Sequence, residues 1–134
     1  MRLIFDCNVV VSALLNDSSP SGQAVLKAKS SSVTLLLSNS VFAEMIDVLM
    51  RPKFDRYASK ELRQLFLEEY EILSTKIKIT NHVQACRDSK DDMYLELALS
   101  GNADCIVTGD LDLLVLNPFE HIPIITPKEF LDRF

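Results

Sequence analysis

Residues 2–6 read Arg-Leu-Ile-Phe-Asp, and residues 103–110 read Ala-Asp-Cys-Ile-Val-Thr-Gly-Asp. Each stretch holds a short apolar run followed closely by an acid, and such runs are typical of strands in a parallel sheet with both faces covered. An unpaired buried carboxylate is costly, so Asp6 must lie in a crevice at its strand end or have a specific partner. In open parallel sheets this crevice lies beyond the carboxyl ends of the strands, where functional groups gather.

Strands and helices alternate along the chain, which predicts an α/β fold whose parallel sheet is covered on both faces. The predicted strands are Arg2–Phe5, Ser32–Leu37, Lys76–Thr80, Ala103–Thr108 and His121–Ile125. The predicted helices are Asn8–Leu15, Gly22–Lys29, Val41–Met50, Lys60–Ser74, Lys90–Ser100 and Lys128–Arg133. Gly101 stands where a left-handed residue often ends a helix, and Thr126 with Glu129 has the capping-box pattern.

The composition predicts one globular domain over residues 1–134, because 48% of the 134 residues are hydrophobic. No run approaches the roughly 18 apolar residues of a membrane span, and no signal peptide is evident, so we expect a cytoplasmic protein. The three cysteines lack C-x-x-C spacing and indicate buried thiols. A net charge of -5 argues against binding nucleic acid by general electrostatics, but two divalent ions (+4) would bring it to -1.

Four segments carry acids toward the predicted carboxyl edge of the sheet. Asp6 ends the first strand, and Glu44 lies one turn into the helix after the second. Asp91 begins the helix before the fourth strand, and Asp110 and Asp112 follow that strand. Oxygen ligands without His or Cys select Mg²⁺ or Mn²⁺, which can activate water and stabilise the leaving oxygen in phosphodiester hydrolysis. Carboxylates this close would repel one another, so we expect raised pKa values without metal.

Structural interpretations of the same acids remain open. Asp91 and its neighbour Asp92 also fit as first-turn helix acids, with Asp92 closing a capping box. Glu44 also fits as a solvent-facing acid of a first helical turn. Asp110 and Asp112 also fit as the cap of a short helix or as a turn.

Polar and basic residues near these acids allow two interpretations each. Asn8 and Ser38 follow strand ends, where each either orients a ligand or a metal-bound water, or caps a helix. A basic run farther along either contacts RNA phosphates or is solvated surface charge. Its members are Arg51, Lys53, Arg56, Lys60 and Arg63.

Several strings, taken in order, resemble the PIN domain family across nearly the whole chain. They are Phe5-Asp6-Cys7-Asn8-Val9, then Ser38 with Glu44, then Asp88-Ser89-Lys90-Asp91-Asp92, then the run from Ala103 to Leu114. The Arg51-Pro52-Lys53-Phe54 string and the Thr108-Gly109-Asp110 turn are similar to the VapC-like PIN subgroup, the toxins of toxin–antitoxin pairs.

The resemblance implies a three-layer α/β/α sandwich with a central, mainly parallel sheet. It implies an endoribonuclease that uses Mg²⁺ or Mn²⁺, with an RNA substrate, an inhibiting antitoxin and a homodimeric state. The implied metal ligands are Asp6, Glu44, Asp91 and Asp110, with Asp112 as an additional or water-mediated ligand and Asn8, Ser38 and Thr108 supporting them. The candidate RNA contacts are Arg51, Lys53 and Arg56. Asp91 is preferred to Asp92 because Leu95 and Ala98 continue its inward helical stripe.

Two other functions fit parts of the sequence. Asp6-Cys7-Asn8-Val9 is superficially similar to the D-x-D-x-[TV] start of haloacid-dehalogenase-type phosphatases, although Asn8 lacks the acid that protonates the leaving group. A catalytically silent PIN-like binding module would keep the fold without the chemistry. A phosphoaspartate trapped at Asp6 would identify the phosphatase, and the lack of any divalent-ion effect on melting would identify the silent module.

Overall fold

A computed structural model describes residues 1–30 and 32–134. Within this part of the chain, five strands form one sheet in the order β3-β2-β1-β4-β5, and every neighbouring pair is parallel. The strands are β1 (Arg2–Phe5), β2 (Thr34–Leu37), β3 (Ser74–Lys76), β4 (Cys105–Val107) and β5 (Ile124–Ile125). The predicted α/β fold with a mainly parallel sheet is therefore confirmed.

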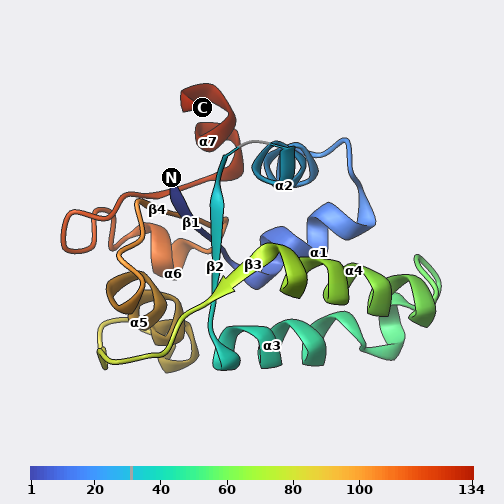
Figure 1. Ribbon diagram of the computed structural model, residues 1–134, viewed down its shortest axis with the longest axis horizontal. Helices are drawn as coiled ribbons and strands as arrows, with labels where there is room; N and C mark the ends of the chain where they lie inside the picture. The colour runs from blue at the N-terminus through green and yellow to red at the C-terminus, as the bar shows by residue number, and fades with distance from the viewer. Residues whose placement is uncertain (31) are drawn as a thin grey trace.

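Helices cover both sides of the sheet and form the two outer layers of the predicted three-layer sandwich. In Figure 1, α5 lies to the left of the strands, whereas α1, α2 and α4 lie to the right. No helix in the described residues is both long enough and apolar enough to span a membrane. The helices are α1 (Cys7–Leu15), α2 (Pro20–Ser30), α3 (Asn39–Leu49), α4 (Lys60–Leu73), α5 (Asp92–Ser100), α6 (Leu111–Leu114) and α7 (Pro127–Arg133), with 3-10 turns η1 (Pro52–Phe54) and η2 (Ser89–Asp91).

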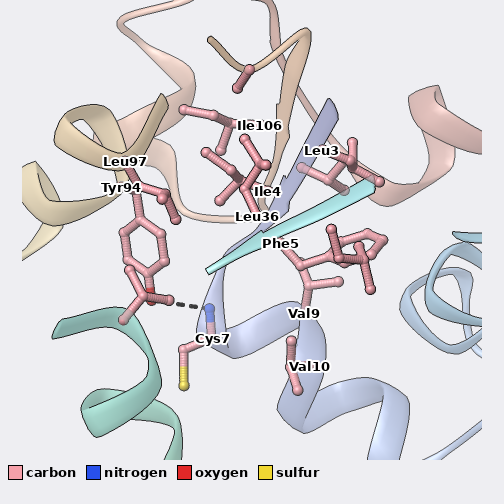
Figure 2. Close-up of a cluster of buried hydrophobic side chains, with 14 of the residues drawn as sticks. Leu3, Ile4, Phe5, Cys7, Val9, Val10, Leu36, Tyr94, Leu97 and Ile106 are labelled. Carbon is pink, nitrogen blue, oxygen red and sulfur yellow. Dashed lines mark hydrogen bonds between the residues drawn. The ribbon is translucent and has the colours of Figure 1, made fainter. Parts of the chain in front are cut away.

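After its first residue, Arg2, the central strand β1 is apolar because both of its faces are covered. Its residues Leu3, Ile4 and Phe5 are at most 1% exposed, and successive strand residues point to opposite faces. Figure 2 shows Ile4 on the side of Leu97 of α5. Phe5 packs edge-on against Phe130 of α7, with ring centroids 6.2 Å apart. The helices on both sides thus hold β1, and with it the position of Asp6, in place.

The third strand begins earlier than the predicted range Lys76–Thr80. Helix α4 runs directly into β3 at Ser74, and the last register pair between β2 and β3 joins Leu37 to Lys76. Strand β2 ends at Leu37 because the next residue, Ser38, caps α3. One further hydrogen bond, from Ile77 N to Leu37 O, ends the ladder, so residues 78–80 have no β2 residues to pair with.

The prediction for the last strand was wrong in its first half. Glu120 and His121 have φ angles of 44° and 73°, and Phe119 and Ile122 pair across the turn that they form. In the described residues the register pairs with β4 are at Ile124 and Ile125, and the Pro123 carbonyl accepts the Ile106 N–H at 2.9 Å.

The helix-end predictions have mixed outcomes. Gly101 has φ -98°, and the left-handed residue is Asn102 with φ 51°. The capping box of Thr126 and Glu129 at the start of α7 is confirmed.

The strand order produces a crevice beside β1. From β1 the chain passes outward to β2 and β3 on one side, and β4 and β5 lie on the other side. At such a reversal the loops that follow the two central strands diverge and leave space beyond their carboxyl ends. Asp6 follows β1, and Thr108 to Asp110 follow β4, so both predicted acid segments reach this space.

Candidate metal centre

Asp6 and Asp110 come from different strand ends and are linked through Thr108. The Thr108 hydroxyl donates to Asp6 Oδ2 at 2.7 Å, and the Asp110 backbone N–H donates to Thr108 Oγ1 at 2.9 Å. Asp6 is only 3% exposed and Thr108 is fully buried. Burial raises the pKa of Asp6, and the hydrogen bond from Thr108 partly opposes that rise. The structure thus gives the buried Asp6 the specific partner that its position required.

Two further carboxylates, those of Asp91 and Asp112, converge with Asp110 at one end of this link. One carboxylate oxygen from each of Asp91, Asp110 and Asp112 lies within 4.8 Å of the other two. Asp110 also caps the short α6 by accepting from the Asp112 N–H at 2.9 Å. Burial and then the nearby Asp110 raise the pKa of Asp91 to about 7, and the charge of Asp6 adds to the effect. Capping and membership in the cluster therefore coexist at Asp110.

Glu44 reaches the same region from α3 and is held by Tyr94 of α5. The Tyr94 hydroxyl donates to Glu44 Oε1 and accepts the backbone N–H of Cys7 at 3.1 Å, the contact drawn in Figure 2. Burial raises the pKa of Glu44, the Tyr94 hydrogen bond opposes the rise, and the charge of Asp6 increases it. Glu44 is the sixth residue of α3 and half-buried, so the alternative of a solvent-facing first-turn acid was wrong.

Asp92 has a different role from its neighbour Asp91. Its Oδ1 accepts the backbone N–H of Ala85 at 3.1 Å and that of Cys86 at 2.8 Å. Burial alone would raise the pKa of Asp92, but these N–H donors keep it below its ordinary value. Asp92 thus holds the preceding loop in place, and the capping box suggested for it does not form, since Asp88 caps η2.

A cavity of about 590 Å³ opens beside the cluster. Asn8 lines this cavity, which agrees with the interpretation that places it near the acids. Ser38 instead caps a helix, because its side chain accepts the Val41 N–H at 3.2 Å. The cavity is lined by Asn8, Arg87, Gly109, Asp110, Leu111 and Asp112.

Sequence reasoning missed two residues that contact the acids. The Arg87 guanidinium forms a fork with Asp112, with Nε 3.1 Å from Oδ1 and Nη2 3.3 Å from Oδ2. Tyr94 is fully buried, and a buried tyrosine hydroxyl needs a polar partner. The signal in the sequence was the place of this tyrosine between Met93 and Leu95 in a predicted helix. Arg87 carried a weaker signal, its place just before the Asp88 to Asp92 string.

The basic run divides into exposed residues and one buried residue. Arg63 is fully buried, donates to the carbonyls of Leu49, Arg51 and Ala58, and pairs with Asp55, so both interpretations given for it were wrong. The predicted RNA contacts are exposed.

Those exposed cations differ in their surroundings. Arg51 pairs with Asp47 at 3.1 Å, and its charge lowers the pKa of Glu44, after the larger effects of burial, Tyr94, Asp6 and Lys90. Lys53 and Arg56 each lie over the ring of the next residue along the chain, 5.1 and 5.6 Å from its centroid.

The donor set fits a hard divalent cation. Carboxylate oxygens converge from separate segments, and the raised pKa values of Asp6, Glu44 and Asp91 mark repulsion and lost hydration that a cation would relieve. The nearby Cys7 thiol is not a competing soft ligand, because burial and then the Glu44 charge raise its pKa to about 12.

Known proteins share both the sequence pattern and the fold. An uncharacterized protein of Methanocaldococcus jannaschii is 28% identical over 143 aligned positions, which span all of this chain and 92% of the relative. A chain in the crystal structure of VapBC2 from Rickettsia felis bound to a DNA fragment from their promoter has a TM-score of 0.56 at 19% identity, over 94% of this chain and 97% of that one. The profile of the PIN domain matches residues 2–112. The chain therefore belongs to the PIN domain family.

Proposed function

We propose that this chain is a metal-dependent endoribonuclease and that residues 1–134 form a single PIN-like nuclease domain. The observation that carries the proposal is the link from Asp6 through Thr108 to Asp110, with Asp91 and Asp112 beside it. The family assignment supports nuclease activity, since PIN domains are typically nucleases. The crevice at the strand-order reversal is also where open α/β sheets bind their ligands.

The acids have distinct places in the proposed site. Asp6, Glu44, Asp91 and Asp110 are the proposed ligands of Mg²⁺ or Mn²⁺, with Asp112 as an additional ligand. Such an ion would activate a water and stabilise negative charge on the leaving oxygen of the phosphodiester.

The surrounding residues have supporting roles in this proposal. Thr108 fixes the Asp6 carboxylate, and Tyr94 orients Glu44. Ser38 supports the site indirectly by capping the helix that carries Glu44. The Asn8 amide, which lines the cavity, is proposed to orient RNA or a metal-bound water.

RNA is the proposed substrate, and exposed cations are proposed to contact its phosphates. Arg51, Lys53 and Arg56 are exposed, and the charge of Arg51 acts on Glu44. Phosphate contacts of this kind position a nucleic acid without reading its bases.

RNA cleavage by the purified protein tests the nuclease. We expect cleavage that requires Mg²⁺ or Mn²⁺ and stops in EDTA. Asp6→Asn should lower the rate more than about 100-fold, because even residues that only support a metal ligand contribute about 10- to 100-fold. The matched control is Asp132→Asn, the same change at an exposed residue of α7. Full activity of Asp6→Asn would exclude this mechanism.

We further propose that the chain is the toxin of a toxin–antitoxin pair, acts in the cytoplasm and forms a homodimer. The fold similarity to a chain of VapBC2 supports this, since that structure holds a VapBC pair on promoter DNA. Induced expression should arrest growth, Asp6→Asn should not, and co-expression of a small protein encoded next to this chain should relieve the arrest. Growth that continues despite full ribonuclease activity would contradict the toxin role. Sedimentation of the purified chain as a monomer would contradict the homodimer.

The two alternatives have clear signatures. A catalytically silent binding module predicts no effect of divalent ions on melting. A phosphatase predicts a phosphoaspartate at Asp6, but the PIN family assignment and the amide at position 8 favour the nuclease.

A further inference from the structure

Arg87 is the basic member of a cavity lining that is otherwise neutral or acidic. Its guanidinium lies against Asp112 with two nitrogens paired to two carboxylate oxygens, at 3.1 and 3.3 Å. The Arg87 side chain is 87% exposed and that of Asp112 is 27% exposed. The cation therefore stands on the solvent side of the pair, where an incoming molecule meets it first.

The pair adds little to the stability of the fold. Water competes strongly for an exposed ion pair, and holding two long side chains in one geometry costs entropy. Arg87 also lies in the irregular segment between β3 and η2, outside any regular element. A cation placed this way can exchange partners at small cost.

A guanidinium fork that fits a carboxylate also fits a phosphate, because both offer two oxygens to parallel N–H donors. The site as proposed must admit a polyanion to a cluster of carboxylates, and a cation at the entrance would offset that repulsion. We propose that Arg87 receives a phosphate of the RNA strand, and that Asp112 holds its guanidinium in position until RNA arrives. This inference rests on the proposed ribonuclease function.

The exchange gives Asp112 two states. While Arg87 is paired to it, both Asp112 oxygens are occupied by a cation of the protein itself. Once Arg87 turns to phosphate, Asp112 is free for the divalent ion beside Asp91 and Asp110. Arg87 thus competes with metal at Asp112 and helps RNA to bind.

The test measures the binding of RNA and the binding of Mn²⁺ in separate assays. RNA binding is measured by anisotropy of a short fluorescein-labelled single-stranded RNA, in the Asp6→Asn background and over a series of KCl concentrations. Adding Arg87→Ala should weaken binding about tenfold and reduce the slope of log Kd against log salt by about 0.7, the value for one phosphate contact on a single strand. Arg87→Lys should retain the slope of log Kd against log salt, because it keeps the charge. Its affinity for RNA should lie between that of the protein with Arg87 and that of Arg87→Ala, because lysine lacks the guanidinium fork.

Metal binding is measured without RNA, by titration of Mn²⁺ into otherwise unmodified protein. Arg87→Ala should bind Mn²⁺ several-fold more tightly, because Asp112 loses a competing cation. The matched control for both assays is Arg133→Ala, the same loss of charge on α7, close to Cys105 at the start of β4 rather than to its carboxyl end. A merely structural role for Arg87 would weaken both kinds of binding.

The outcomes separate this inference from the proposed function. If Asp6→Asn binds RNA, and Arg87→Ala then matches Arg133→Ala in affinity and slope, the phosphate contact is excluded while the nuclease survives. If Arg87→Ala binds Mn²⁺ equally or more weakly, the competition at Asp112 is excluded. If the unmodified chain neither binds nor cleaves RNA, the proposed function itself fails.

Discussion

At Asp91 the demands of the site oppose those of stability. Burial and then Asp110 raise the pKa of Asp91 to about 7, whereas an aspartate in the unfolded chain has a pKa of about 3.9. At a pH between these two pKa values, Asp91 is protonated in the folded chain and ionised in the unfolded chain. The stabilising effect of that proton is complete below about pH 4 and is lost as the pH rises through about 7. The metal-free protein at neutral pH therefore carries a destabilising carboxylate at this position.

Asp91→Asn should stabilise the metal-free protein at pH 8, because the amide removes the charge that its neighbours oppose. We expect a gain of about 1 kcal/mol, less than the pKa difference implies because solvent screens a half-exposed group, or a rise in Tm of a few degrees. Thermal melts in EDTA from pH 3.5 to 8 would measure it. The gain should vanish below about pH 4, and Asp132→Asn should give none. A variant less stable than the unmodified chain at pH 8 would contradict the raised pKa.

At the same scale, sequence reasoning located the acids but not their neighbours. Asp6 was predicted because an acid at the end of an apolar strand must lie in a crevice or have a specific partner, and Asp110 because it follows another predicted strand, although a helix cap also fitted it. Asp91 was preferred to Asp92 as the ligand because of the inward helical stripe. In the structure Asp91 belongs to the acidic cluster, whereas Asp92 accepts hydrogen bonds from the Ala85–Cys86 loop. Arg87 was missed because its role depends on a contact across 25 positions of the chain.

At the scale of elements, Tyr94 joins three helices at one oxygen. It belongs to α5, donates to Glu44 of α3 and accepts the first backbone N–H of α1, that of Cys7. A helix leaves its first N–H groups without intrahelical partners, so this contact satisfies a buried donor at the start of α1. The position of Glu44 beside Asp6 thus depends on how α5 packs.

Tyr94→Phe should loosen this junction without changing the shape of the core. It leaves the Cys7 N–H and the Glu44 carboxylate without their shared partner, so we expect a loss of about 1 to 3 kcal/mol in the free energy of unfolding. The affinity for Mn²⁺ should also fall. Urea unfolding and Mn²⁺ titration measure the two effects. Tyr57→Phe, at a tyrosine that is 65% exposed, is the matched control and should change neither. Stability equal to that of the control would show that Tyr94 is not needed at the junction.

Element boundaries were predictable only where a local signal fixes them. The capping box sets the start of α7 through residues a few positions apart. The bounds of β3 instead depend on where β2 ends, because an edge strand exists only opposite its neighbour. The alternation from Lys76 to Thr80 satisfied the strand pattern but had nothing to pair with beyond Ile77.

At the scale of the whole molecule, the order of the strands in the sheet could not be predicted from local sequence patterns. Alternating strands and helices predicted a parallel sheet, but many orders satisfy that pattern. The order β3-β2-β1-β4-β5 makes β1 and β4 neighbours, and only this pairing brings Asp6 to Thr108 and Asp110. Local patterns did not predict this strand order, whereas the resemblance to the PIN family implied the fold as a whole. The crevice follows from the strand order.

The site as a whole concentrates negative charge in a molecule that already carries a net charge of -5. A divalent ion bound by the folded chain alone would stabilise it by RT ln(1 + [ion]/Kd), about 1.4 kcal/mol at ten times Kd. Millimolar Mn²⁺ should therefore raise Tm by a few degrees, and EDTA should reverse the shift. NaCl at matched ionic strength is the control for general screening. Asp91→Asn should start from a higher Tm in EDTA yet gain less from Mn²⁺, because the charge that destabilises the empty cluster is the charge that would bind the ion. Equal Mn²⁺ shifts in both proteins would place the ion elsewhere on the surface.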